Sequence, residues 1–291
     1  MYSGSIVALV TPMNEDGSLD LGALDALVDW HVEAGTAAIA PVGTTGESPT
    51  VTMTENCALI ERVVRAAAGR VPVIAGTGAN ATAEALDLTR SAKASGADAA
   101  MLVAPYYNRP TQEGLRRHYL RVADAVDMPL LLYNVPPRTA SDIQPETAVA
   151  LSRHPNIVGI KDASGDPSRV HRILDHADPG FCFLSGEDWL TRTLMQLGAH
   201  GTVSVTANVV PDRMAAFCAA MLAGEHDRAR PLDAALQPLH AALFCETSPS
   251  PVKWALHRMG RIPAGIRLPL LPLSEPRRPL LEGVLHDLGV V

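Results

Sequence analysis

The sequence NIVGIKD, residues 156–162, predicts a short strand that ends in a lysine. Three apolar residues lie within four positions of this stretch, a pattern typical of parallel-sheet strands that are buried on both faces. Lys161 therefore comes directly after a stretch of buried apolar residues. Desolvation disfavours the charged form of a lysine, and a neutral amine is a nucleophile that can attack a ketone to form a Schiff base. The alternative is a structural ion pair with Asp162 or Asp166, which is the commoner arrangement for a lysine considered alone.

Length and composition allow one large α/β barrel or two ordinary domains. The chain has 291 residues, of which 47% are hydrophobic, so it can bury a large core. Its formal net charge of −7 comes from scattered residues without a basic stripe, which argues against nucleic-acid binding. The sequence contains neither a run of about 18 apolar residues nor a signal-peptide pattern at its start, so we expect a cytoplasmic protein with no membrane role.

Cysteines and histidines give no metal-site pattern. The four cysteines are far apart and form no C-x-x-C pair, as expected for reduced structural thiols: Cys57, Cys182, Cys218 and Cys245. His171 and His176 are an i, i+5 pair, which does not share a helix face as the ligands of an H-x-x-x-H motif do. We therefore expect no metal site.

Strand and helix patterns alternate along most of the chain. Strands are predicted at residues 5–10, 36–42, 71–75, 97–104, 128–134, 157–161, 181–185 and 200–205. Helices are predicted at 21–32, 54–67, 82–95, 111–126, from Pro145, and at 188–197. Asp20 and Thr82 are the expected N-caps of the first and third of these helices, and VPPRT at 135–139 is expected to form a Pro-stiffened loop. Eight such strands predict one closed parallel (β/α)8 TIM barrel.

The barrel is expected to cover residues 1–210 and to be followed by a C-terminal helical region at 211–291. Helices are predicted there at 212–222, 227–243, 251–259 and 280–288. The stretch between Gly260 and Pro279, rich in proline and leucine, is predicted to be a docked linker.

One motif favours a different class of enzyme. Residues 76–81, GTGANA, match the pattern G-x-G-x-x-A of a dinucleotide-binding turn, with Asp98 about 20 residues further on. That pattern belongs to the first strand of an open sheet, whereas two strand–helix units precede it here. A tight barrel turn is therefore the favoured interpretation, with a nicotinamide-dependent oxidoreductase as the competing class.

Unusual residues gather after the predicted strands, at the face where barrel enzymes hold their active sites. GTTGES at 43–48 offers glycines, amides and the hydroxyls of Thr44 and Thr45 that can hold a carboxylate. The remaining candidates are Tyr106, Tyr107, Tyr133, Arg138, the segment 185–188 with Gly186, and Val203.

These side chains suit a Schiff-base reaction on an acidic substrate. A hydrogen-bonded tyrosine can shuttle the protons that Schiff-base formation requires. Arg138 offers a planar fork for a carboxylate, although a surface ion pair is an equally common use of arginine.

Six segments in this order resemble the family of 4-hydroxy-tetrahydrodipicolinate synthases, pyruvate-dependent class I aldolases. They are PVGTTGES, APYYNRPTQEG, YNVPPRT, GIKDASGD, LSGEDW and RLPLLPLSE, and they span nearly the whole chain. The resemblance implies a lyase of lysine and diaminopimelate biosynthesis that condenses pyruvate with L-aspartate 4-semialdehyde. It requires neither a metal nor an organic cofactor, because the lysine itself supplies the electron sink.

The resemblance also implies residue roles. Lys161 would carry the Schiff base, Tyr133 would donate and accept protons, and Thr44 and Tyr107 would be its relay partners. Thr45 would hold the pyruvate carboxylate and Arg138 that of the semialdehyde, while Gly186 and Val203 would shape the pocket through their backbones. The tyrosine that matches Tyr107 reaches into a neighbouring subunit, which implies a tight homodimer, commonly paired into a tetramer.

Relatives on the same scaffold give the main alternative, an N-acetylneuraminate lyase or a sugar-acid (2-keto-3-deoxy) aldolase or dehydratase. Arg138 favours the synthase. A non-catalytic barrel that only binds pyruvate-like acids is a further possibility. Ser48, Asn80, Glu84 and Tyr106 match the lysine-binding site of feedback-inhibited members, but Met53 and Asn56 stand where histidines are frequent. We therefore expect weak or absent inhibition by lysine.

Overall fold

Eight parallel strands form the centre of the molecule, in a computed structural model that describes residues 1–291. The strands are β1 (Gly4–Ala8), β2 (Ala38–Ala40), β3 (Ile74–Gly76), β4 (Ala99–Val103), β5 (Leu130–Asn134), β6 (Ile157–Asp162), β7 (Cys182–Ser185) and β8 (Gly201–Ser204). Their order in the sheet is β2-β1-β8-β7-β6-β5-β4-β3, and a parallel bridge between Ile39 and Val73 joins the two ends. The predicted TIM barrel is confirmed, and its strands begin or end one to three residues inside several predicted bounds.

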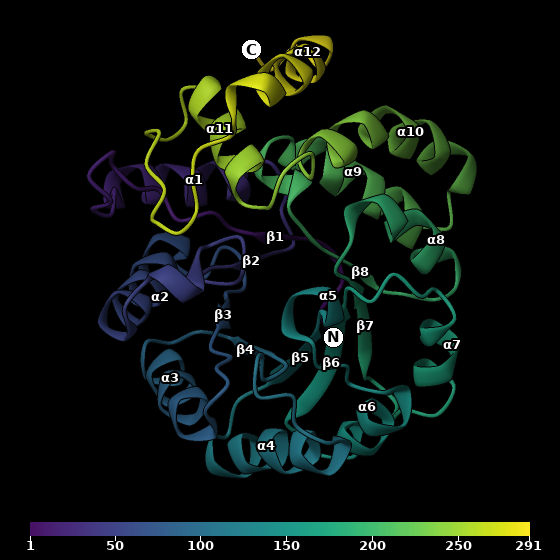
Figure 1. Ribbon diagram of the computed structural model, residues 1–291. Coiled ribbons are helices and arrows are strands. Elements are labelled where there is room, and N and C mark those ends of the chain that lie inside the picture. The colour runs from purple at the N-terminus through teal and green to yellow at the C-terminus, as the bar shows by residue number, and fades with distance from the viewer.

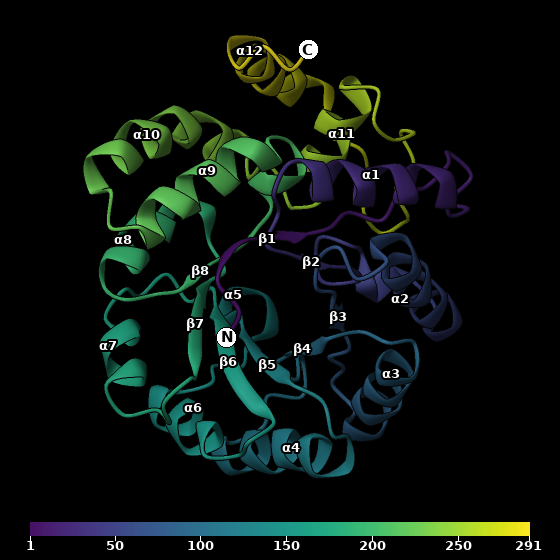
Figure 2. The same ribbon diagram turned by 180° about the vertical axis from the view of Figure 1, so that it is seen from behind.

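Helices surround this barrel (Figures 1 and 2). They are α1 (Leu21–Glu33), α2 (Met53–Ala67), α3 (Thr82–Ala94), α4 (Gln112–Ala125), α5 (Pro136–Thr139), α6 (Pro145–Ser152), α7 (Arg169–Leu174), α8 (Thr191–Gln196), α9 (Pro211–Leu222), α10 (His226–Ala242), α11 (Ser250–Arg258) and α12 (Arg278–Asp287). Figure 1 shows α11, in yellow-green, and α12, in yellow, outside the ring. None of the helices is long and apolar enough to cross a membrane.

Strand residues alternate between two apolar cores, because successive side chains of a strand point to opposite faces. Leu130 and Leu132 of β5 belong to the larger core, between the barrel and its helices. Leu131 and Tyr133 belong to a smaller core inside the barrel. This alternation decides which residues at the strand ends reach the interior and which face the helices.

Three local predictions differ from the structure. Thr82 is not a cap: Ala81 takes the N-cap position of α3, and the Thr82 hydroxyl lies 3.0 Å from Nδ1 of His118 on α4. The predicted VPPRT loop contains a helical turn, α5, since prolines are tolerated in the first turn of a helix. The short helix α7 was not predicted, whereas Asp20 caps α1 as expected, accepting a 2.9 Å hydrogen bond from the amide of Ala23.

The glycines of residues 76–81 serve close backbone approach. A Cβ atom on Gly76 would lie 2.2 Å from the carbonyl oxygen of Val42, and one on Gly78 would lie 2.3 Å from the amide nitrogen of Val103. These glycines therefore allow the chain after β3 to pass between its neighbours, which supports the barrel-turn interpretation of the motif.

A buried ion pair ties the C-terminal region to the loop after β2. Nζ of Lys253 on α11 bonds to the carboxylate of Glu47, and the two side chains are 4% and 0% exposed. Burial lowers the pKa of Lys253, and the charge of Glu47 opposes that shift. Arg267 adds a second link, because its guanidinium contacts both carboxylate oxygens of Glu55 at 2.6 and 2.8 Å. That contact holds the pKa of Glu55 at about 2.

Replacing Lys253 with methionine is expected to destabilise the protein strongly, because Glu47 would remain buried without its counter-charge. We expect the free energy of unfolding to fall by about 3 to 5 kcal/mol, measured by urea denaturation with circular dichroism. The double variant Lys253→Met/Glu47→Gln removes both charges and should recover part of the loss. Equal stability of the wild type and Lys253→Met would contradict this role of the ion pair.

Candidate active site

The pairing of β5 with β6 places Tyr133 beside Lys161. The two residues are partners in the parallel register, so their side chains project from the same face of the sheet. Nζ of Lys161 lies 4.0 Å from the centroid of the Tyr133 ring. Lys161 is only 5% exposed, and it forms no ion pair with Asp162 or Asp166. The structural ion pair considered as an alternative is therefore wrong.

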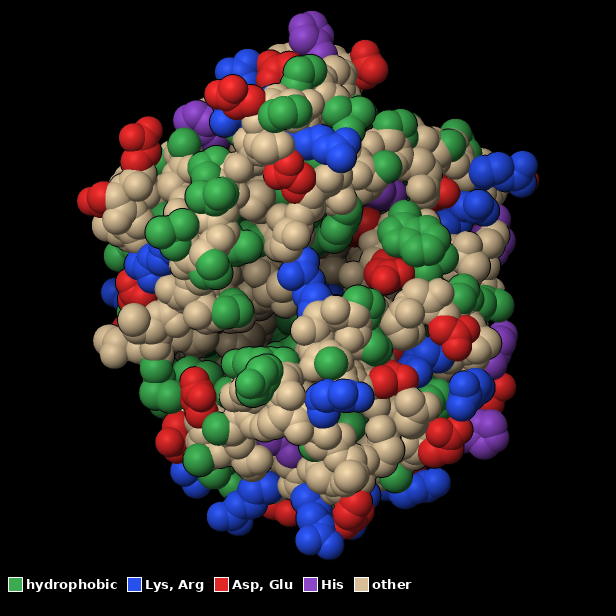
Figure 3. Space-filling model, viewed as in Figure 1, with side chains coloured by type: hydrophobic (Ala, Val, Ile, Leu, Met, Phe, Trp, Pro, Cys, Tyr) green, Lys and Arg blue, Asp and Glu red, His purple; other side chains and the backbone are tan.

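A cavity of about 390 Å³ opens above this pair. Figure 3 shows a hollow near the centre of one face, with basic, acidic and apolar side chains around it. The lining residues come from the strand ends, the loops that follow them and α10: Thr44, Thr45, Tyr133, Val135, Pro137, Arg138, Lys161, Ala163, Gly186, Glu187, Trp189, Val205, Gln237, His240, Ala241, Phe244 and Ser248. Most of the predicted catalytic and substrate-binding residues thus meet in one cavity.

Arg138 is an exposed side chain at the cavity with no acidic partner. It lies on α5, and its Nη2 donates a 3.3 Å hydrogen bond to the carbonyl oxygen of Ser248. A surface ion pair, the alternative use of Arg138, does not form. The remaining nitrogens of the guanidinium are available for a carboxylate ligand.

Close packing of β6 and β7 explains Gly186. Its amide donates a 2.7 Å hydrogen bond to the carbonyl oxygen of Asp162. A Cβ atom at this position would lie 2.7 Å from the Cβ of Ala163, closer than such atoms approach one another. Any other residue would push the loop after β7 away from Lys161.

The loop at 43–48 is held in a strained form. Val42 and Glu47 have φ angles of 53° and 58°, in the left-handed region that side chains normally avoid. The Thr11 hydroxyl donates a 2.7 Å hydrogen bond to the carbonyl oxygen of Gly46, and Lys253 holds Glu47 from the other side. Thr45, buried within this loop, and Thr44 therefore keep defined positions at the cavity.

Two predicted residues lie outside the cavity wall. Val203 is buried in the core inside the barrel, next to the β1 residue Ile6 in the sheet register. Tyr107 is 88% exposed and has a φ angle of 72°. The chain itself does not bring Tyr107 to the cavity.

The residues matched to a lysine site lie in two places. Nδ2 of Asn80 donates a 3.3 Å hydrogen bond to the carbonyl oxygen of Tyr106. Partial burial and the charge of Glu84 raise the pKa of Tyr106. Ser48 instead lines a small void of about 20 Å³ that it shares with Thr44 and Tyr133.

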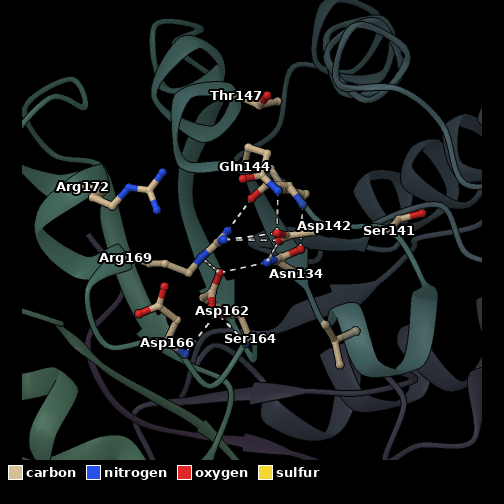
Figure 4. A network of polar contacts seen from close by, with 12 residues as sticks. Asn134, Ser141, Asp142, Gln144, Thr147, Asp162, Ser164, Asp166, Arg169 and Arg172 are labelled. Carbon is tan, nitrogen blue, oxygen red and sulfur yellow. Dashed lines mark hydrogen bonds and ion pairs between the residues drawn. The ribbon is translucent and has the colours of Figure 1, made fainter.

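Beside Tyr133 and Lys161, a buried polar network holds the ends of β5 and β6 together (Figure 4). Asn134 and Asp162 follow Tyr133 and Lys161, and Nδ2 of Asn134 donates a 3.0 Å hydrogen bond to the Asp162 carboxylate. Nε of Arg169 donates to the same oxygen at 3.1 Å. The charge of Asp162 is thereby satisfied away from Lys161.

The network extends to the loop before α6. Nδ2 of Asn134 also donates a 2.9 Å hydrogen bond to Asp142, and Nη1 of Arg169 lies 3.3 Å from that carboxylate. The Asn134 side-chain oxygen accepts from the amide of Ile143 at 2.9 Å. Every polar group of Asn134 is therefore engaged, which orients the strand end on which Tyr133 stands.

Sequence reasoning missed the part of the cavity formed by α10. His240 and Ala241 follow Gln237 by three and four residues and so share one face of α10 with it, and Phe244 comes just after the helix ends at Ala242. The one available signal was the mixture of polar and apolar residues on that face. His240 is held by a 2.7 Å contact between its Nδ1 and the Thr206 hydroxyl, and burial lowers its pKa. The structure contains no group of three or more potential metal ligands.

Comparison with known proteins gives the family. The family model described as "Dihydrodipicolinate synthetase family" matches residues 1–288. The chain belongs to this family. It is 55% identical over 291 residues to the 4-hydroxy-tetrahydrodipicolinate synthase of Alcanivorax borkumensis, a match that covers 100% of the chain and 99% of the relative. It is 56% identical over 290 residues to the protein of the same name from Azoarcus sp., again covering 100% and 99%.

Solved structures of family members have the same fold. The chloride-inhibited dihydrodipicolinate synthase of Acinetobacter baumannii, complexed with pyruvate, has a TM-score of 0.98 at 52% identity, covering all of both chains. The family and the aldolase-type lyase predicted from the sequence are confirmed. The function is that of a 4-hydroxy-tetrahydrodipicolinate synthase, and the N-acetylneuraminate lyase and sugar-acid aldolase alternatives are not favoured.

We expect Asp162→Asn to impair catalysis, because the change removes the buried negative charge that Arg169 and Asn134 share. A displacement of Tyr133 from Lys161 should lower kcat by about 10- to 100-fold. Steady-state kinetics test this, alongside thermal unfolding to account for lost stability. Arg172→Gln breaks a surface pair with Glu146 and is the matched control, with unchanged kcat. A folded Asp162→Asn enzyme with wild-type kcat would contradict the positioning role.

Proposed function

We propose that Lys161 attacks the ketone carbon of pyruvate and forms a Schiff base with loss of water. Removal of a proton from the methyl group then gives an enamine, whose carbon adds to the aldehyde of L-aspartate 4-semialdehyde. Cyclisation through the amino group of the semialdehyde releases the product and regenerates Lys161. The observation that carries this proposal is a buried lysine without an acidic partner, 4.0 Å from a tyrosine ring at the cavity.

Tyr133 is proposed to donate and accept the protons of the carbinolamine stage, with Thr44 and Tyr107 as its relay. Thr44 and Tyr133 line both the main cavity and the small void behind it, which supports a connection between them. Proton transfer by a positioned hydroxyl requires such proximity.

Tyr107 is proposed to complete the relay of a neighbouring subunit, in a tight dimer that pairs into a tetramer. Support comes from its exposure and from its φ angle of 72°, held by a 3.2 Å hydrogen bond from its amide to the carbonyl oxygen of Thr139. An aromatic side chain held outward in this way is suited to an interface. Analytical ultracentrifugation should detect dimers or tetramers and no stable monomer.

The carboxylates of the two substrates are assigned to two different residues. Thr45 is proposed to hold the pyruvate carboxylate, and Arg138 that of the semialdehyde, since its guanidinium is free of acids. Gly186 is proposed to shape the pocket through its backbone at the cavity wall. Val203 is proposed to act in the same way from β8, although its side chain lies in the inner core.

Feedback by lysine is proposed to be weak or absent. Ser48, Asn80, Glu84 and Tyr106 remain the candidate lysine contacts, but Asn56 is buried and its Nδ2 lies 3.5 Å from the carbonyl oxygen of Gly76. That contact turns the amide toward its own chain. Strong inhibition of the purified enzyme by micromolar lysine would contradict this proposal.

We also propose a division at residue 210, with the catalytic barrel before it and the helical region 211–291 packed on it. Contacts of α9 with β1 support a firm attachment of the second part. A cytoplasmic location is proposed as well, because all four cysteines are free thiols.

Reduction with borohydride in the presence of pyruvate should attach the three-carbon acid covalently to Lys161, because the reductant traps the Schiff base. Peptide mass spectrometry locates the adduct. The same preparation should consume pyruvate when L-aspartate 4-semialdehyde is added. Lys161→Arg is the control and should give neither adduct nor turnover. A wild-type enzyme that remains unmodified would end the proposed mechanism.

Arg138→Leu is expected to raise the KM for the semialdehyde and to lower kcat/KM, because the carboxylate loses its charged partner. The loss should amount to about 2 to 4 kcal/mol of binding energy in the transition state. Steady-state kinetics with each substrate varied in turn measure it. Trapping of pyruvate at Lys161 should persist. An unchanged kcat/KM for the semialdehyde would remove Arg138 from its assigned role.

A further inference from the structure

Glu187 is the only acidic side chain that lines the active-site cavity. The lining residues with basic side chains are Lys161 and Arg138. Neither forms an ion pair with Glu187. A single carboxylate in a wall that otherwise offers hydroxyls, an amide, an imidazole and apolar groups is a distinct chemical feature.

The backbone of Glu187 is held firmly. The Glu187 amide donates a 3.2 Å hydrogen bond to the Ser185 hydroxyl, which fixes its orientation. The same hydroxyl donates to the Glu187 carbonyl oxygen at 2.8 Å. The Thr191 hydroxyl donates to the same carbonyl oxygen at 3.1 Å. The side chain therefore projects from a defined point at the end of β7.

The carboxylate itself is left without a partner. Its Oε2 atom is buried and makes no hydrogen bond. Gly165, with a φ angle of 77°, lies beside it, and a Cβ atom there would be in ordinary van der Waals contact with Oε2, at 3.8 Å. The loop after β6 thus packs against this oxygen without supplying a hydrogen-bond donor to it.

The electrostatic surroundings favour a cation at this point. Burial and the nearby charge of Asp162 raise the pKa of Glu187. The guanidinium of Arg169, the cation paired with Asp162, is directed to Asp162, Asp142 and the carbonyl oxygen of Ile143. A buried acceptor without a partner is unfavourable, and an ammonium group from a ligand would supply up to three donors.

We propose that Glu187 binds the ammonium group of the aldehyde substrate and makes the enzyme selective for an α-amino acid over an aldehyde acid that lacks the amino group. The assignment rests on the proposed condensation. Arg138 holds the carboxylate of the second substrate, Glu187 holds its ammonium, and the enamine on Lys161 meets its aldehyde. Three separate attachments around one small molecule also define the configuration at its α carbon.

Other acceptors at the cavity are weaker candidates for this ammonium. Gln237 and His240 carry no negative charge, and Nδ1 of His240 is already engaged by Thr206. The carbonyl oxygen of Ser248 already accepts from Arg138. A carboxylate is the stronger partner, because hydrogen bonds between two charged groups are about twice as strong as neutral ones.

The variant Glu187→Gln tests the proposal, with two aldehydes of equal chain length. L-Aspartate 4-semialdehyde has the amino group, and succinic semialdehyde lacks it. For the first, kcat/KM measured by pyruvate consumption should fall about 10- to 100-fold. For succinic semialdehyde, kcat/KM, or its inhibition constant against the amino aldehyde, should stay within about twofold of wild type. Glu187→Asp keeps the charge and should retain most of the selectivity.

A structural role for Glu187 predicts a different result, namely equal losses for both aldehydes. That outcome, or no loss for either, would overturn the proposal. Glu146→Gln, which alters an exposed acid outside the cavity, is the control and should leave both values unchanged. Borohydride trapping of pyruvate at Lys161 distinguishes a failure of the Glu187 assignment from a failure of the proposed condensation. If the wild type traps pyruvate and condenses it but Glu187→Gln keeps its selectivity, only the assignment of Glu187 is wrong.

Discussion

The parallel pairing of β5 with β6 is the constraint on which the active site depends. It sets Tyr133 against Lys161 inside the barrel and Asn134 against Asp162 outside it. Gly159 allows close packing on both sides of β6, because a Cβ atom there would lie 2.8 Å from Cδ2 of Leu131 on β5 and 2.2 Å from Sγ of Cys182 on β7. A single position without a side chain thus lets three strands approach closely next to Lys161.

Charge is distributed around this pair so that the lysine remains available. Asp162, adjacent to Lys161 in sequence, would quench a reactive amine if its carboxylate turned toward it. Strand geometry points it to the outer face, where Arg169 and Asn134 satisfy it. Apart from the lysine, the cavity wall carries one basic side chain, Arg138, and one acidic side chain, Glu187, and the two are not paired with each other. A zwitterionic substrate matches that arrangement better than a simple carboxylic acid does.

Features that depend on neighbouring residues in sequence were predictable. The barrel follows from repeated strand and helix patterns, and Thr44, Tyr133, Lys161 and Gly186 follow because parallel strands end at one face. The lining residues on α10 were not, since nothing local indicates that a helix after the barrel folds over the cavity. Thr82 was misread for a related reason: His118, from another helix, takes its hydroxyl. Glu187 was noticed only as part of a close backbone approach, because an unpaired carboxylate is a property of three-dimensional surroundings.

The ion pair between Glu47 and Lys253 joins residues 206 positions apart in the chain. The loop that bears Thr44 and Thr45 therefore leaves the ribosome long before the side chain that neutralises its buried acid. At bacterial elongation rates of about 5 to 20 residues per second, this interval lasts roughly 10 to 40 s. The loop at 43–48 therefore gains the counter-charge of its buried acid only after α11 has been synthesised. A nascent chain truncated before α11 carries Lys161 but lacks Lys253, the partner of the buried Glu47.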